Sequence, residues 1–251
     1  MRVQYCSDLH LEFKQNSKHL TTHPINVCGD ILILAGDIVP LHDEFLNDSF
    51  FSFISKNFKQ VFWVPGNHEY YYKDISDYSR SFNTKLHGNI NVVNNIYLQY
   101  EGIGFIFSTL WSRLSPENRG NIEQYVSDFE CITNKGKKFK ASDFNKLHIE
   151  SLSFIRQSLS NKKDKTVVVT HHLPSALCDS PVHNTSPIKE AFCVDLTDYI
   201  EESNANFWLY GHSHYNQKPV YIGNTILLTN QLGYVHLNEN ALFKQDAYFS
   251  I

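Results

Sequence analysis

The stretch Ile31-Leu32-Ile33-Leu34-Ala35-Gly36-Asp37 joins an unbroken apolar run to a glycine and a carboxylate. An apolar run without polar alternation predicts a strand that is buried on both faces, as in the parallel sheets of α/β proteins. Such sheets place their ligand crevice at the carboxyl ends of their strands. We therefore expect Asp37 to project into a functional site where this strand ends.

Four other stretches repeat this pattern of an apolar run followed by a short polar block. The predicted strands are residues 3–7, 61–64, 166–170 and 207–210. The blocks that follow them are Asp8-Leu9-His10, Gly66-Asn67-His68-Glu69, His171-His172 and Gly211-His212-Ser213-His214. One edge of a sheet would bring these blocks together although they lie far apart in the sequence.

The segments between these strands predict the remaining architecture. Helical spacing is found in residues 43–58, 74–87 and 142–159, and Asp143 is a plausible cap for the last of these helices. Residues 91–107 predict two strands around Glu101-Gly102, and residues 218–235 a hairpin that turns at Gly223-Asn224. The alternation predicts an α/β fold with a single domain over residues 1–251. The polar segment 113–140 interrupts it, and we interpret that segment as a surface insertion.

Composition excludes several classes of protein. The chain has 251 residues, of which 42% are hydrophobic and 19% charged, which is ordinary globular usage. Its formal net charge of -4 disfavours binding to nucleic acid through a basic surface. The five cysteines lack CxxC spacing, which argues against a disulfide framework or a zinc–thiolate site. Without a long apolar run or a signal-peptide pattern, we expect a cytoplasmic protein with no membrane contact.

The polar blocks offer oxygen and nitrogen ligands and no thiolate. Such donors suit divalent ions of intermediate hardness, such as Mn²⁺, Fe²⁺ or Zn²⁺. The candidate metal ligands exceed what one tetrahedral ion uses, so we expect two ions that share a carboxylate. These candidates are Asp8, His10, Asp37, Asn67, His171, His212 and His214. Of the His171-His172 pair we favour His171 because it follows the strand directly. The glycines Gly36, Gly66 and Gly211 would permit the tight turns that aim these side chains.

Taken together and in order, the five blocks resemble the calcineurin-like metallophosphoesterases. The resemblance spans Asp8 to His214 and implies a four-layer αββα sandwich with a dinuclear site that hydrolyses phosphoesters. It implies that Asp8, His10 and His214 hold one ion, that Asn67, His171 and His212 hold the other, and that Asp37 bridges them. His68 would be the catalytic histidine that faces the substrate, and a hydroxide between the ions would attack phosphorus in line.

Departures from the family pattern narrow the resemblance. The arginines that grip phosphate in serine/threonine protein phosphatases are missing beside Gly36-Asp37 and before Gly66. Pro40 stands where purple acid phosphatases have a tyrosine ligand. The chain is more similar to small bacterial or phage-type phosphoesterases, with Thr-His-His-x-Pro-Ser and Thr-Leu-Trp blocks at residues 170–175 and 109–111.

The function that we expect is hydrolysis of a small phosphodiester or phosphomonoester, with Mn²⁺ as the preferred cofactor. His172 and Trp111 are candidate substrate contacts. We expect Glu69 to be structural, for instance as a hydrogen-bond partner of a ligand histidine. Two alternatives stay open: a non-catalytic metal-binding interaction module on the same fold, and a nuclease. A degenerate module would be missing ligands or His68, and a nuclease would need a basic groove.

Overall fold

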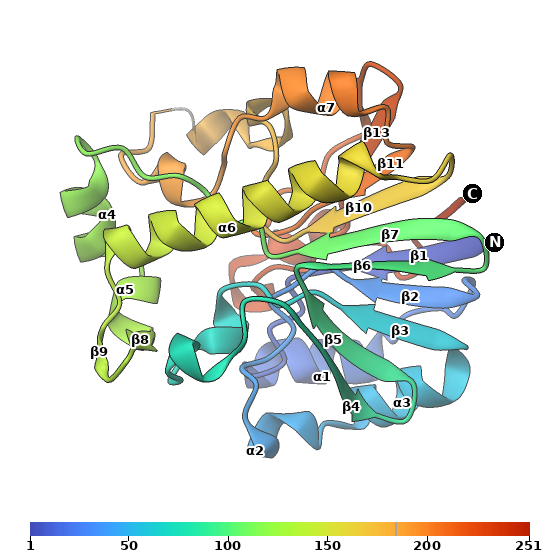
Figure 1. The fold of residues 1–251 in the computed structure, drawn as a ribbon. Helices are drawn as coiled ribbons and strands as arrows, with labels where there is room; N and C mark the ends of the chain where they lie inside the picture. Colours follow the sequence, from blue (N-terminus) through green and yellow to red (C-terminus); the bar gives the residue numbers. More distant parts are fainter. Residues whose placement is uncertain (184) are drawn as a thin grey trace.

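The computed structural model describes residues 1–183 and 185–251. Two six-stranded mixed sheets pack face to face, and helices cover their outer faces, so that the molecule has four layers (Figure 1). The predicted α/β sandwich is thereby confirmed. No described helix has the length and apolar character that crossing a bilayer requires.

The two sheets have the same plan, with four parallel strands in the centre and one antiparallel strand at each edge. The first has the order β14 (Tyr248–Ser250), β1 (Arg2–Cys6), β2 (Ile31–Leu34), β3 (Gln60–Trp63), β5 (Ile90–Asn94), β4 (Phe82–His87). The second has the order β12 (Val220–Ile222), β13 (Thr225–Leu228), β11 (Phe207–Leu209), β10 (Thr166–Thr170), β7 (Ile103–Ser108), β6 (Ile96–Tyr100).

Helices form the outer layers. The first sheet is covered by α1 (Lys14–Thr22), α2 (Asp43–Leu46) and α3 (Ser49–Asn57), and the second by α6 (Ala141–Ser160) and α7 (Thr197–Ser203) (Figure 1). At the N-terminal end of α6 lie α4 (Arg119–Tyr125), α5 (Asp128–Cys131), β8 (Thr133–Asn134) and β9 (Lys137–Lys138). Short 3₁₀ helices span His68–Tyr70, Ile75–Asp77, Ala176–Cys178, Pro181–His183, Lys189–Ala191, Val235–Leu237 and Glu239–Leu242.

The central strands are buried on both faces because each alternates between two cores. In β2, Ile31 and Ile33 face the core between the sheets, whereas Leu32 and Leu34 face α1 and α3. In β10, Val167 and Val169 point inward and Val168 faces the core under α6. These strands therefore hold the polar blocks that follow them on a rigid base.

Two predicted helices differ in the structure. Residues 43–58 form α2 and α3 rather than one helix, because Asp48 caps the second by accepting a hydrogen bond from the Phe50 N–H. Residues 74–87 are not helical: they hold a 3₁₀ turn at Ile75–Asp77 and strand β4. This segment pairs with β5, and Phe82 and Leu86 are partly buried against the core under α1 and α3. These tertiary contacts override the helical spacing.

Other elements agree with the sequence more closely. Strands β6 and β7 turn at Glu101-Gly102, and β12 and β13 turn at Gly223, with positive φ at all three residues. Residues 91–94, however, belong to a further strand, β5, which joins the other sheet. Helix α6 starts slightly earlier than predicted, and Asp143 is its third residue, where its carboxylate accepts a hydrogen bond from the Lys140 N–H.

The polar segment 113–140 has an apolar underside. Phe129, Ile132 and Phe139 are fully buried and pack with Trp111 and Phe144 in a separate cluster beneath α6. This packing fixes the position of α5, whose first residue enters the site described below.

Candidate active site

The predicted metal ligands follow strand ends and hold unusual backbone conformations. Asp8, His10, Asp37, His212 and His214 all have φ between 47° and 78°, the left-handed region that favours glycine. Such conformations cost about 1–3 kcal/mol each and persist where the surrounding structure enforces them, which is most often at functional sites. The five strained residues all carry polar side chains that lie close together, as expected for a functional site.

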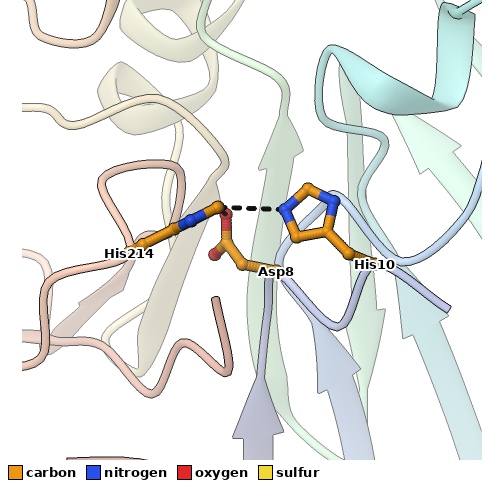
Figure 2. Close-up of side chains that lie close together, drawn as sticks. All are labelled: Asp8, His10 and His214. Atoms are coloured by element: carbon orange, nitrogen blue, oxygen red, sulfur yellow. Dashed lines mark hydrogen bonds and ion pairs between the residues drawn. The ribbon is translucent and has the colours of Figure 1, made fainter. Parts of the chain in front are cut away.

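The first donor group consists of Asp8, His10 and His214 (Figure 2). The Nε2 atoms of His10 and His214 are 2.9 Å apart, and His214 Nε2 is 3.5 Å from Asp8 Oδ1. Outside the group, the Nδ1 atoms of the two rings face carboxylates: His10 Nδ1 is 3.2 Å from Glu12, and His214 Nδ1 is 2.6 Å from Glu239. The carboxylates orient both rings so that their Nε2 atoms converge.

The second donor group consists of Asp37, His171 and His212, with Asn67 beside them. His171 Nε2 lies 3.1 Å from His212 Nδ1, 3.2 Å from Asn67 Oδ1 and 3.4 Å from Asp37 Oδ1. The other nitrogen of His171, Nδ1, donates to the carbonyl of Ala35 at 2.9 Å. All four donor side chains are buried.

Each group holds one protonated and one neutral imidazole. Burial lowers the pKa of His171, but the Asp37 carboxylate outweighs it and raises this pKa to about 9. Burial and the neighbouring histidines hold the pKa of His212 well below its usual range. In the first group the balance of burial, Asp8 and Glu239 raises the pKa of His214 to about 10, and burial lowers that of His10. The carboxylates thus hold a proton where nitrogen and oxygen donors converge, which is where a divalent cation fits.

His68 lies next to both donor groups but is not one of their predicted ligands. Its Nδ1 is 2.9 Å from Glu12, its ring stacks on Tyr71 at 4.1 Å between centroids, and its Nε2 is 4.0 Å from Asp37. Burial opposes and Asp37 and Glu12 favour its charged form, so that the pKa of His68 is raised. The ring presents Nε2 towards the space between the donor groups.

The floor of a cavity of about 720 Å³ is formed by Asp37, Asn67, His68, His212 and His214. Asp8, His10 and His171 are fully buried and do not line it. Its wall is rich in aromatic groups, including Phe13, Tyr234 and Phe192, and the exposed rings of Tyr72 and Tyr125 also line it. Among the described residues that line it there is one lysine, Lys189, and no arginine. The cavity therefore combines a polar, cation-seeking floor with a largely apolar wall.

Trp111 and His172, which the sequence analysis offers as substrate contacts, do not line this cavity. Trp111 is 1% exposed and packs against Phe144, and His172 is fully buried behind His212 with no hydrogen-bond partner at either ring nitrogen. Burial holds the pKa of His172 well below its usual range, so it stays neutral. The prediction for these two residues is corrected: Trp111 packs against His172, and His172 packs against the candidate ligand His212.

Glu69 has a structural role, as expected, although it forms no hydrogen bond with a candidate ligand histidine. Its carboxylate accepts hydrogen bonds from the N–H groups of Asp37, Ile38 and Gly66 and from the indole of Trp63. These bonds tie together the two loops that carry Asp37 and Asn67. Glu69 is therefore a structural clamp on the backbone of the site.

Only one of the three glycines acts through a left-handed turn. Gly36 has a φ of +93°, whereas no positive φ is found at Gly66 or Gly211. At these two positions a Cβ atom would collide with donor side chains: those of Asp37 and His171 at Gly66, and that of Asp8 at Gly211. Close packing against the ligands, rather than turn geometry, requires glycine there.

Sequence reasoning missed several residues that contact the site. Glu12 and Glu239 orient ligand rings, and Asp128 accepts a hydrogen bond from Asn67. Glu12 lies two positions after His10, on the same turn, and this spacing was a usable signal. Asp128 and Glu239 lie in segments without a motif, and no signal in the sequence identifies them.

Comparisons with known proteins agree with this geometry. The family model for calcineurin-like phosphoesterases matches residues 1–216. The uncharacterized protein L509 of Acanthamoeba polyphaga mimivirus is 34% identical over 279 aligned positions, which cover all of this chain and 97% of that protein. The crystal structure of the phosphopantetheinyl hydrolase PptH from Mycobacterium tuberculosis has the same fold, with a TM-score of 0.72 and 17% identity over 98% of this chain and 95% of PptH.

Proposed function

This chain belongs to the calcineurin-like phosphoesterases and is a metal-dependent phosphoric ester hydrolase, and from that premise we propose that it cleaves a small phosphodiester at a two-ion centre. The observation that carries the proposal is the convergence of two donor groups around Asp37, whose carboxylate oxygens lie 3.4 Å from His171 Nε2 and 3.9 Å from His10 Nε2. Asp8, His10 and His214 would hold one ion, and Asn67, His171 and His212 the other. Asp37, between the groups, would serve both.

The donor set supports divalent ions of intermediate hardness. Mn²⁺ is the ion that we propose, with Fe²⁺ and Zn²⁺ as the alternatives, because the groups offer imidazole and oxygen and no thiolate. When bound, such ions would lower the pKa of the attacking water and offset negative charge on the phosphoryl oxygens.

We also propose that the protein is cytoplasmic, because the spacing of its cysteines does not indicate a disulfide framework.

The chain's own part in the chemistry centres on His68. Glu12 accepts the Nδ1 proton of His68 and leaves Nε2 free to face the ester. From there a protonated His68 would donate its Nε2 proton to the leaving oxygen or a hydrogen bond to a phosphoryl oxygen. The stacked Tyr71 ring restricts the imidazole to this orientation.

The cavity wall supports an uncharged substituent on the ester. A diester carries one negative charge, whereas a monoester dianion or a polyphosphate carries more and would need cationic groups that the wall offers only at Lys189 among its described residues. The exposed aromatic rings of Tyr72 and Tyr125 suit an apolar or uncharged chain. PptH is named for hydrolysis of a phosphopantetheinyl group, and we propose a diester with a comparably uncharged arm for this chain.

Two other functions have less support. A nuclease needs a cationic groove to track the phosphate backbone, and the cavity wall carries little positive charge. A non-catalytic module would have no need to keep His68 and all seven candidate ligands, which this structure brings to one site.

The test is a substrate panel with the Mn²⁺-loaded protein. We expect hydrolysis of bis-p-nitrophenyl phosphate to exceed that of p-nitrophenyl phosphate, cyclic nucleotides and single-stranded DNA, and Asp37→Ala to abolish it. If the loaded protein cleaves none of these esters, the non-catalytic module replaces the enzyme. Faster cleavage of single-stranded DNA than of the small diester would support the nuclease.

A further inference from the structure

Asp128 reaches the site from a segment that has no motif. It is the first residue of α5, is 1% exposed and lies on the wall of the cavity. Its Oδ1 accepts hydrogen bonds from Asn67 Nδ2 at 2.7 Å and from the Tyr71 hydroxyl at 2.8 Å. The packing of Phe129 and Ile132 beneath α6 holds the carboxylate in this place.

Asn67 needs such a partner because an amide has two ends of nearly equal shape. Its Oδ1 faces His171 Nε2 at 3.2 Å, inside the second donor group, and its Nδ2 faces Asp128. Only the oxygen has a lone pair for a cation, whereas the NH₂ group would exclude one. The usefulness of Asn67 therefore depends on which end points into the site.

We propose that Asp128 is a positioning residue that locks the Asn67 amide with its oxygen turned towards the metal centre. Asp128 Oδ1 accepts hydrogen bonds from Asn67 and Tyr71, so it pairs with the NH₂ end of the Asn67 amide and repels the oxygen end. The proposal rests on the proposed function for the ligand role of Asn67. It makes the inserted segment 113–140 part of the metal centre.

Without this carboxylate, the reverse orientation loses the repulsion that opposes it. A flipped amide would turn its NH₂ group, in place of its oxygen, towards His171 Nε2 inside the second donor group, where it would exclude a cation. Asp128 prevents the flip because the two oxygens would then face each other at hydrogen-bond distance. Partners that orient metal ligands in this way typically contribute about 10–100-fold to metal affinity.

Asp128 also supports the neighbouring catalytic candidate. The Tyr71 hydroxyl donates to it, and the Tyr71 ring stacks on His68. One carboxylate from α5 thereby orients a ligand amide and the ring that restricts His68.

The test exchanges the two members of the pair. Asp128→Asn keeps the shape of the side chain but offers either end of an amide to Asn67, so we expect the affinity for one of two Mn²⁺ equivalents to fall about tenfold. The double variant Asn67→Asp with Asp128→Asn reverses the pair and again sets one donor against one carboxylate. We expect it to recover affinity to within about threefold of the wild type, a non-additivity that a purely structural role would not produce.

Competition with a fluorescent chelator measures the two dissociation constants for Mn²⁺, and thermal melting of each metal-free variant reports its fold. Glu130→Gln is the control, because it removes an exposed negative charge from the same helix. Wild-type affinity in Asp128→Asn, or a reversed pair that binds no tighter than Asp128→Asn, would overturn the proposal.

Hydrolysis of bis-p-nitrophenyl phosphate is measured in parallel and separates the two proposals. If the wild type binds two Mn²⁺ ions but cleaves no ester, the proposed function fails while the affinities still decide the role of Asp128. If the wild type hydrolyses the diester and Asp128→Asn binds Mn²⁺ unchanged, only the positioning role fails.

Discussion

Asp37 lies between the two donor groups. Its carboxylate oxygens are 3.4 Å from His171 Nε2, 3.9 Å from His10 Nε2 and 4.0 Å from His68 Nε2. Although burial opposes its charge, the surrounding histidines, His171 first, hold the pKa of Asp37 well below its usual range. The Asp37 carboxylate is therefore held in its charged form, close to a histidine of each donor group.

Replacing Asp37 should affect both ions at once. We expect Asp37→Ala to lose more Mn²⁺ than Asp8→Ala or Asn67→Ala, and to reduce turnover by several orders of magnitude, because positioning and charge neutralisation fail together. Elemental analysis of the three loaded variants measures the first effect and initial rates the second. Retention of both ions in Asp37→Ala would contradict the shared role.

His68 should be separable from metal binding. Asn67 is the proposed ligand of that loop, and His68 is held by Glu12 and Tyr71 instead. We expect His68→Ala to keep both Mn²⁺ ions and to lose about 10²–10⁴ in rate, the usual contribution of a general acid. Release of an ion from this variant would show that His68 is itself a ligand.

The leaving group tells which task His68 performs. If it donates a proton, the loss should shrink for p-nitrophenolate, which is a weak base, and grow for alkyl esters. An equal loss for both kinds of ester would place His68 on the phosphoryl oxygens instead.

The loops after β2 and β3 act as one element. Glu69 binds the backbone of both, and the Asp37 carboxylate accepts the His68 N–H at 3.0 Å. Gly66 lies at their contact, where no side chain fits. The loops can therefore present Asp37 and Asn67 at a fixed separation.

A methyl group at this contact should disturb the metal centre. In Gly66→Ala the Cβ atom meets Asp37 and His171, so we expect weaker Mn²⁺ binding and a loss of about 1–3 kcal/mol in the free energy of unfolding, as for other overpacked sites. Gly120→Ala is the matched control, because Gly120 lies in α4 with open space around its Cβ position. Chemical denaturation and chelator competition measure both effects. Equal behaviour of the two variants would contradict the packing role of Gly66.

The whole molecule concentrates strained backbone and buried charge at one end of the central strands. Asp8, Asp37, His171 and His10 are all at most 2% exposed. A protein with such a site is expected to be most stable when cations replace the protons held there, because only the folded chain brings the donors together.

Metal removal should therefore lower stability. We expect two Mn²⁺ equivalents per chain, and at one hundred times the dissociation constant an ion stabilises the folded state by about 2.7 kcal/mol. For a chain of this size that corresponds to a rise in Tm of about 5–10 °C per ion, so the two-ion protein should melt about 10–20 °C above the chelator-treated protein. Calorimetry with Mn²⁺ and with EDTA measures the shift, and elemental analysis the stoichiometry. One equivalent per chain, or an unchanged Tm, would contradict the two-ion centre.

The strand pattern predicted an α/β fold and the candidate ligands, and the resemblance carried by the five polar blocks predicted the sandwich and the family. Buried strands are recognisable in the sequence as apolar runs. Because the residues that follow parallel strands lie at the same edge of a sheet, Asp8, Asp37 and His171 could be placed together from the sequence. The left-handed conformations at His212 and His214 bear no such signature, yet their block was recognisable from its order after the other four.

The side chains that surround those candidate ligands could be identified only from the folded chain. The burial of His172 and Trp111, the edge strand β4 and the contact of Asp128 with Asn67 all depend on elements that are distant in the sequence. Such contacts follow from packing, for instance of Phe129 beneath α6, and packing leaves no period or motif in the segment that provides the polar group. For this reason the sequence predicted the segment 113–140 to be a polar surface insertion, although its buried carboxylate, Asp128, faces the site.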